Sequence, residues 1–292
     1  MSYPPFSVCV HRHWTGFQEK HEREWCYLER KPKSKEKDQV VVVFLHGFSA
    51  AKESFLSCAA ALPREFWVLI PDLPSHGKTA ATASTIDEML VQIAEFVHWM
   101  DEPVHLVGCS MGGLLTGLLA AKYPSLVRSI TLMCPAGLTM PTKSSAILHY
   151  ESTGQNLFQL ESPEELRHAI PFLFHRPPAI PTGILRYIAH ERALRAKVQE
   201  PILRDILFHS SRVLEECVQE IEAQTLIIWG REDQVLDLSC LQVLEDKLKQ
   251  RPKVRIFENA GHVVQREKAR KCAVEIQKFI ADYNGCERDD QT

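Results

Sequence analysis

Residues 104–115 read Val-His-Leu-Val-Gly-Cys-Ser-Met-Gly-Gly-Leu-Leu, and this stretch decides the fold. An apolar run typical of a buried strand leads directly into Gly108-Cys109-Ser110-Met111-Gly112, and leucines at helical spacing follow it. A G-x-S-x-G turn between a strand and a helix presents its serine oxygen at the end of the strand. Side chains two residues before and after the serine would collide with neighbouring backbone, so both positions must be small. We therefore predict Ser110 as a nucleophile.

Outward from this turn, short apolar runs alternate with helical stretches, which is typical of a mostly parallel sheet with helices on both faces. The four consecutive valines of residues 39–45 predict a strand covered on both faces. A helix should begin at Ser84, and the last helix should cover about residues 268–280. The full set of predicted strands is residues 25–28, 39–45, 66–70, 104–107, 127–133, 225–229 and 254–257.

One long segment, about residues 136–223, breaks this alternation because it has no clear strand. Its short helical patches include Ser162-Pro163-Glu164-Glu165, a capping box with proline at the first helical position. We interpret the segment as a helical cap inserted into a single α/β domain that takes in residues 1–292. The polar tail, about residues 284–292, is expected to be loose.

The composition is that of an ordinary soluble protein with enough apolar residues for a full core, and it gives little sign of a charged partner. The net charge of −3 argues against a nucleic-acid partner, because no strong field surrounds the protein. Nine cysteines without a C-x-x-C pair suit a reducing compartment and suggest no metal site. The first residues contain no apolar secretion signal and no twenty-residue apolar run follows, so the sequence predicts a cytoplasmic protein.

Two backbone N–H groups should stabilise the oxyanion that forms when a serine attacks a carbonyl. One belongs to Met111, the residue after the nucleophile, and the other to Phe48, in the loop after the strand of residues 39–45. His46, beside that loop, is expected to hold it by hydrogen bonds and to take no part in catalysis. Cys109 is a rival nucleophile, but its side chain should point away from the site and act as a small filler.

The remaining members of a Ser–His–Asp triad should follow later strands, in the order serine, acid, histidine. Residues 225–229 form such a strand, and Asp233 comes soon after it; Asp237 and Glu232 stay open as alternatives. His262 follows the last strand and is therefore the expected base. His262 would take the Ser110 proton, Asp233 would orient the imidazole, and water would release the acyl group, without metal or organic cofactor.

Several motifs resemble the α/β-hydrolase superfamily, and within it the monoacylglycerol lipases of the sixth α/β-hydrolase-domain-containing type. The motifs that carry this resemblance are residues 45–50, 106–113, 134–138, 227–238 and 258–262. The resemblance implies an α/β-hydrolase fold, hydrolysis of an acyl-ester lipid, and catalytic roles for Ser110, Asp233 and His262. Family members carry an N-terminal membrane anchor that we do not find in this sequence, and their Asp-x-Pro-Gly-His-Gly loop has Ser75 in place of the glycine.

Two other functions remain open at this point. A C–C bond hydrolase of the meta-cleavage type would use the same triad on acidic substrates, so its pocket needs a cation, and Arg176, Arg186 and Arg192 are candidates. A non-catalytic scaffold of the same fold is the second alternative, although such proteins usually lose a triad residue. The cap is further expected to line an acyl pocket or to meet a lipid surface through Phe172 and Phe174.

Overall fold

An eight-stranded sheet in the order β1-β2-β4-β3-β5-β6-β7-β8 forms the centre of the protein. The computed structural model describes residues 15–33 and 39–289, with side chains up to residue 283. All neighbouring strands from β4 to β8 run parallel, whereas β2 is antiparallel to both of its neighbours. The strands are β1 (Gln18–Glu22), β2 (Trp25–Arg30), β3 (Val41–Leu45), β4 (Trp67–Pro71), β5 (Val104–Cys109), β6 (Val127–Met133), β7 (Gln224–Gly230) and β8 (Lys253–Phe257).

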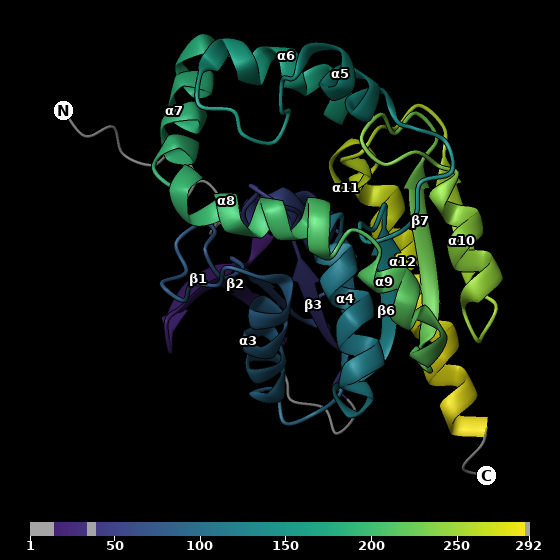
Figure 1. Cartoon of the computed structure of the whole chain (residues 1–292). Coiled ribbons are helices and arrows are strands. Elements are labelled where there is room, and N and C mark those ends of the chain that lie inside the picture. Colours follow the sequence, from purple (N-terminus) through teal and green to yellow (C-terminus); the bar gives the residue numbers. More distant parts are fainter. Residues whose placement is uncertain (1–14, 34–38, 290–292) are drawn as a thin grey trace.

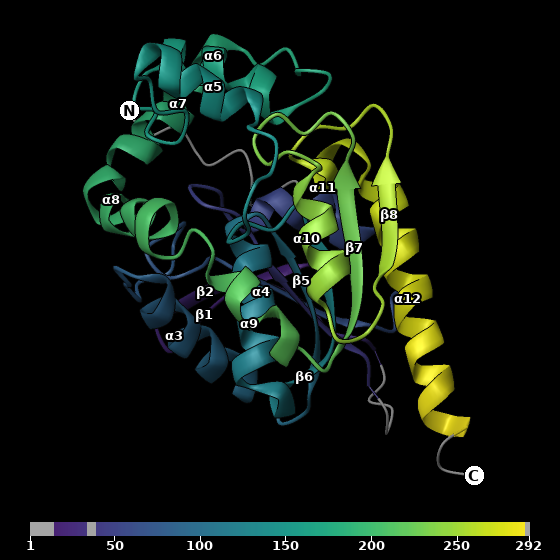
Figure 2. The ribbon, with the colours of Figure 1, turned by 45° about the vertical axis from the view of Figure 1, so that its right-hand side comes forward.

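Helices cover both faces of this sheet, as the sequence predicted (Figures 1 and 2). On one face α3, α4, α9 and α10 pack against one another, and on the other α12 packs against α2 and α11. The central helix α4 is buried along most of its length because it lies between β5, β6 and the outer helices. These helices are α2 (Leu56–Ala60), α3 (Ile86–His98), α4 (Met111–Lys122), α9 (Val213–Cys217), α10 (Cys240–Lys247), α11 (Val264–Glu267) and α12 (Ala269–Asp289), with short 3-10 turns at η1 (Lys52–Phe55), η2 (Pro124–Leu126) and η4 (Val218–Glu220).

All seven predicted strands are present, and the structure adds β1, which the sequence did not reveal. β1 pairs with β2 in a hairpin whose two turn residues, Arg23 and Glu24, have φ angles of 46° and 70°. Such left-handed turns usually carry glycine or asparagine, so the sequence gives no turn signal at this point. β1 is also polar and lies at the edge of the sheet, so it lacks the apolar alternation that marks a half-buried strand.

Two helix ends differ from expectation. The N-cap of α3 is Thr85, whose hydroxyl accepts the Glu88 N–H, and not Ser84. The last helix, α12, continues to Asp289, so residues 284–289 of the expected loose tail are helical, while residues 290–292 lie outside the described part. Once a helix is nucleated, each further residue adds one backbone hydrogen bond. The backbone of α12 can therefore continue through the polar residues 284–289.

Between β6 and β7 the described chain contains helices and no strand. These helices arch over one end of the sheet, and α8 returns beneath the arch toward it (Figure 1). Leu160, Leu166, Ala169, Leu185 and Ala189 form a small hydrophobic core separate from the main one. The helices of the arch are α5 (Ser145–Thr153), α6 (Pro163–Leu173), α7 (Thr182–Ala193), α8 (Ala196–Arg204) and the π-helical η3 (Asp205–His209). The segment ends with α9 and η4, which pack against α4 on one face of the sheet, and we refer to residues 136–212 as the cap.

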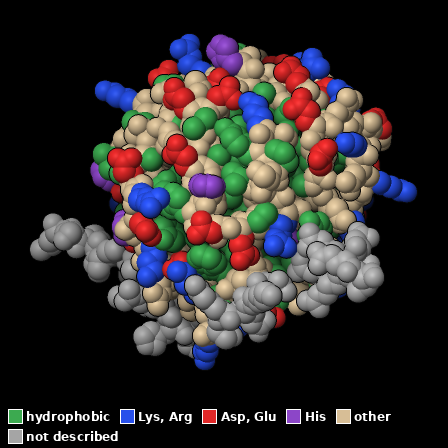
Figure 3. Space-filling model, turned by 90° about the horizontal axis from the view of Figure 1, so that it is seen from below, with side chains coloured by type: hydrophobic (Ala, Val, Ile, Leu, Met, Phe, Trp, Pro, Cys, Tyr) green, Lys and Arg blue, Asp and Glu red, His purple; other side chains and the backbone are tan. Residues whose placement is uncertain are grey.

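The end of the molecule opposite the cap carries acidic and basic side chains intermingled with small apolar areas (Figure 3). This distribution agrees with the net charge of −3, since neither sign dominates that face. No helix among the described residues combines the length and the apolar character that a membrane crossing requires.

Candidate active site

The three predicted triad residues follow strands that end at the same edge of the sheet. Ser110 comes directly after β5, Asp233 follows β7, and His262 follows β8. Because β5, β6, β7 and β8 are consecutive parallel neighbours, their carboxyl ends present these loops side by side beneath the cap (Figure 2). Ligand and catalytic sites of open α/β sheets occur at this edge.

The turn around Ser110 is strained in the way that the motif predicted. Ser110 has φ 57° and ψ −120°, an unusual conformation for a residue with a side chain. A Cβ on Gly108 would lie 2.0 Å from the Gly112 carbonyl oxygen, and one on Gly112 would lie 2.0 Å from the Leu45 carbonyl oxygen. Neither position can carry a side chain, so the two glycines allow the sharp turn that exposes the serine.

Asp233 and His262 form a direct pair. His262 Nδ1 lies 2.9 Å from Asp233 Oδ2, and both residues are buried. The other carboxylate oxygen, Oδ1, accepts the backbone N–H groups of Val235 at 2.8 Å and Leu236 at 3.0 Å. These bonds fix the carboxylate, and the described residues offer His262 Nε2 no hydrogen-bond partner. Ser110 and His262 are not hydrogen-bonded to each other in the described structure; such contacts often tighten only with substrate.

The alternative acids have structural roles. Asp237 Oδ1 accepts the Ser239 N–H at 2.9 Å, at the start of α10. Glu232 Oε2 accepts the Ala260 N–H at 2.9 Å, which ties the loop after β7 to the loop after β8. Of the three carboxylates that the sequence left open, only Asp233 contacts the histidine ring.

The predicted oxyanion-hole donors lie on either side of Ser110. A Cβ on Gly47 would stand 3.2 Å from the Ser110 Cβ, so the loop that carries Phe48 touches the nucleophile. Met111 is the first residue of α4, where helical N–H groups have no partner within the helix. Within the described chain neither the Phe48 nor the Met111 N–H has an acceptor, so both are available to an oxyanion.

His46 and Cys109 behave as the sequence predicted. His46 is fully buried, with Nδ1 2.8 Å from the Gly47 carbonyl oxygen and Nε2 accepting the Leu73 N–H at 3.0 Å. Burial lowers the pKa of His46, which keeps the ring neutral as a brace of the loop. Cys109 is buried too, and its Sγ donates to Gln265 Oε1 at 3.4 Å, so this thiol points away from the nucleophile.

A comparison of the sequence with known protein families gives a match to the alpha/beta hydrolase family over residues 42–275. The chain belongs to the alpha/beta hydrolase family. This hydrolase is 33% identical to monoacylglycerol lipase abhd6-A of Xenopus laevis, over 90% of this chain and 81% of that protein. It is also 33% identical to the human monoacylglycerol lipase ABHD6, over 83% of this chain and 76% of that protein.

Solved structures give the same fold. A membrane phospholipase A, described as a bacterial virulence factor, superposes with a TM-score of 0.85 and 29% identity, over 94% of this chain and 89% of that one. A dienoate hydrolase from a Rhodococcus strain has a TM-score of 0.73 at 19% identity, over 91% and 99% of the two chains. At 19% identity, the similarity to the dienoate hydrolase shows a shared fold and nothing about function.

The hydrolase has an apolar cavity of about 350 Å³ between the cap and the carboxyl edge of the sheet. Ser110, Met111 and Phe48 line it, and none of its lining residues is charged. The remaining lining residues are Ala136, Gly137, Leu138, Met140, Ala146, Ile147, Tyr150, Asn156, Leu157, Phe158, Leu203, Ile206, Leu207, Phe208, Ser211, Val235 and Leu236.

Among the residues that the structure describes, two groups of side chains are close enough to share a metal ion, but both are already engaged. Cys134 lies beside the Asp233–His262 pair, where the carboxylate is bound by backbone N–H groups and the imidazole. In the second group, with His21 and Cys26, Glu19 is paired with lysines. Neither group therefore offers a free carboxylate.

Sequence reasoning missed Glu267, which joins the loop of His262, the predicted base, to the cap. Its carboxylate accepts the Gly261 N–H at 2.7 Å, next to His262, and the N–H groups of His175 and Arg176 at 3.2 and 3.1 Å. These partners are 6 to 92 residues away from Glu267 along the chain, so no local sequence pattern predicts the contacts.

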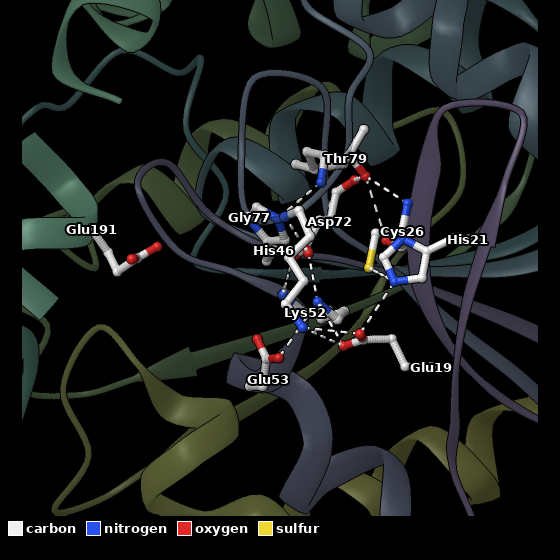
Figure 4. A network of polar contacts seen from close by, with 12 residues as sticks. Glu19, His21, Cys26, His46, Lys52, Glu53, Asp72, Gly77, Thr79 and Glu191 are labelled. Carbon is white, nitrogen blue, oxygen red and sulfur yellow. Dashed lines mark hydrogen bonds and ion pairs between the residues drawn. The ribbon is translucent and has the colours of Figure 1, made fainter. Parts of the chain in front are cut away.

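A buried ion pair, which the sequence analysis also missed, supports the loop of residues 72–77. Lys52 donates from Nζ to Asp72 Oδ2 at 2.6 Å, and its backbone N–H reaches Oδ1 at 2.8 Å. Glu19 lies 3.5 Å away on the other side of the amine, as Figure 4 shows. Burial alone would lower the pKa of Lys52, but Asp72 raises it above its usual value. The pair joins η1 to the loop of residues 72–77, which contacts the cap.

We expect Lys52→Met to destabilise the fold by about 3–5 kcal/mol, because it leaves the Asp72 carboxylate buried without its cation. Lys78→Met is the matched control, since its pair with Glu19 is partly exposed and worth less than about 1 kcal/mol. The measurement is the free energy of unfolding in urea. Equal losses in the two variants would contradict the structural role of Lys52.

Proposed function

We propose that this carboxylic ester hydrolase acts on monoacylglycerols through an acyl-enzyme on Ser110. The observation that carries the proposal is the uncharged, apolar cavity that ends at Ser110 between two unpaired N–H groups. An acyl chain fits such a lining, whereas an ionised head group would lose its hydration there without a partner. The names of the relatives that match over most of the chain support the same substrate class.

In the proposed reaction, His262 Nε2 takes the Ser110 proton as Oγ attacks the ester carbonyl carbon. The tetrahedral oxyanion receives the Phe48 and Met111 N–H groups. The protonated imidazole, stabilised by Asp233, then gives its proton to the glycerol oxygen as the C–O bond breaks. Water, deprotonated by His262, attacks the acyl-enzyme, and the fatty acid leaves as Ser110 regains its proton.

Cleavage of C–C bonds in acidic dienoates fits this cavity less well. None of the three arginines that could have bound such a substrate lines it. Arg176 and Arg186 are exposed, and the Arg192 guanidinium is bonded to Ser49. The scaffold alternative is also disfavoured, because the chain retains Ser110 in the G-x-S-x-G turn together with a bonded acid–histidine pair.

A substrate panel tests the proposal. Purified protein is offered monoacylglycerol, triacylglycerol, lysophospholipid, a short nitrophenyl ester and a dienoate, and reaction with a fluorophosphonate is followed in parallel. We expect labelling of Ser110, turnover of the short ester and highest catalytic efficiency on monoacylglycerol. Preference for the dienoate or the charged lysophospholipid would contradict the substrate class, and absence of all labelling would contradict the serine mechanism.

The expectation that Phe172 and Phe174 line the acyl pocket is wrong, because neither lines the cavity. Phe174 is buried beneath the Arg266 guanidinium, and Phe172 is half-buried against the His149 ring, so both have packing roles within the protein. Three of the large exposed apolar side chains line the cavity: Phe208 is 70% exposed, Tyr150 53% and Leu207 43%. Because the same residues line the cavity, we propose that this rim docks on the lipid from which the substrate enters.

We expect Leu207→Ser with Phe208→Ser to reduce binding to phosphatidylcholine vesicles about tenfold or more, since burying one such side chain contributes roughly 1.5–3 kcal/mol. Vesicle sedimentation measures binding, and turnover of a short soluble ester checks that the chemistry survives. Ile184→Ser with Tyr187→Ser is the control, because these residues are equally exposed on α7 but do not line the cavity. Unchanged vesicle binding in the rim variant would contradict the proposal.

A further inference from the structure

The last turn of cap helix α7 lies against the loop that contains Phe48. Arg192 donates from Nε to Ser49 Oγ at 2.7 Å, and its Nη2 lies 3.5 Å from the Ser49 carbonyl oxygen. The two residues are 143 positions apart, so this contact joins the cap to the catalytic domain. Burial lowers the pKa of Arg192 to about 10, which still leaves the guanidinium charged at neutral pH.

Ser49 immediately follows Phe48 and has a left-handed backbone, with φ 54°. A residue with a side chain rarely adopts this conformation unless its surroundings hold it there. The loop itself supplies one bond, from the Ala50 N–H to the Gly47 carbonyl oxygen at 3.2 Å. His46 Nδ1, 2.8 Å from the same carbonyl oxygen, braces the loop before Phe48. After Phe48, the Ser49 bond to Arg192 holds the left-handed turn, so the direction of the Phe48 N–H depends on both contacts.

We propose that Arg192 is a positioning residue that aims the Phe48 N–H at the oxyanion through Ser49. The oxyanion hole is then complete only while α7 is seated on the catalytic domain. This role rests on the proposed serine mechanism. Arg192 does not line the cavity, so its effect is on the transition state and not on binding of the ester.

Arg195 provides a matched comparison within the same cap. Its Nη2 and Nε donate to the Gly77 carbonyl oxygen at 2.8 and 3.1 Å, and Gln199 reaches the Ser75 carbonyl oxygen at 3.1 Å. These bonds also seat the cap, but on the loop of residues 72–77. A general loosening of the cap would follow from losing either arginine, whereas a change in the oxyanion hole should follow from losing Arg192 alone.

The test compares Arg192→Met, Arg192→Lys and Arg195→Met in the full chain with a short soluble ester. We expect kcat to fall about tenfold in Arg192→Met, a part of the hundred- to thousandfold typical for loss of a whole donor, with KM little changed. Affinity for a boronic acid, which mimics the tetrahedral state, should fall in parallel, while a non-cleavable ether analogue binds as before. Arg192→Lys should recover part of kcat, and Arg195→Met should keep it.

Ser49→Ala added to Arg192→Met should cost nothing further, since the two side chains act as one unit. Equal losses in Arg192→Met and Arg195→Met, an effect on KM alone, or an unchanged boronic acid affinity would each overturn the positioning role. A wild-type protein that takes no fluorophosphonate label would overturn the proposed mechanism and this role with it. A labelled wild type beside an unimpaired Arg192→Met overturns the role only.

Discussion

Ser110→Ala is expected to lower ester turnover by about 10⁴ to 10⁶, the loss typical of a triad nucleophile. No neighbouring group can replace the hydroxyl, because the adjacent Cys109 thiol is buried and bonded to Gln265. The fold should survive, since the unusual backbone at position 110 is imposed by the glycines around it and not by the hydroxyl. Rates on a short ester, fluorophosphonate labelling and the melting temperature give the three readouts.

Cys109→Ala is the control for this experiment. It removes the rival nucleophile one residue away and should keep both labelling and turnover. Labelling that persists in Ser110→Ala and disappears in Cys109→Ala would reverse the assignment.

The second large effect is expected for Asp233→Asn, at about 10⁴ in kcat. Because Oδ1 accepts two backbone N–H groups, the amide oxygen of asparagine should take that side and turn its NH₂ toward His262. Nδ1 would then have to accept a hydrogen bond, which puts the imidazole proton on Nε2, where it cannot receive the proton from Ser110. The direction of the amide is thus set by the residues that hold the carboxylate.

Asp237→Asn should leave kcat near the wild-type value, because an amide oxygen can still accept the Ser239 N–H. Both variants are measured on the same ester, with melting temperatures to confirm that they are folded. A larger loss in Asp237→Asn would move the acid to that position.

The sequence predicted the parallel strands because their apolar runs are continuous, as in residues 41–45, where every side chain is buried. It missed β1 because a polar edge strand has no such run. It chose Ser84 in place of Thr85 as the N-cap of α3, since two adjacent hydroxyl residues satisfy the same pattern. Local sequence thus determines the type of an element more clearly than its ends.

The positions of the candidate site residues were predictable to the extent that each follows a strand. The order of β5, β7 and β8 along the chain pointed to Ser110, Asp233 and His262, and the contacts of Asp233 bring it alone against the histidine ring. Residues that support the site were not predictable, because Glu267 and Arg192 act on partners as far as 92 and 143 positions away. The orientation of Phe174 likewise depended on Arg266, from another part of the chain.

The separate hydrophobic core of the cap has a consequence for how such a protein can change over evolutionary time. Five small and medium apolar side chains hold α6 and α7 together without taking space in the sheet. Substitutions among them reach the cavity through Leu157, which packs against this core and lines the cavity, while the strand ends that carry Ser110, Asp233 and His262 keep their spacing. Selection can therefore change which substrates bind without changing the reaction that the protein carries out. Substrate preference and catalysis can evolve independently.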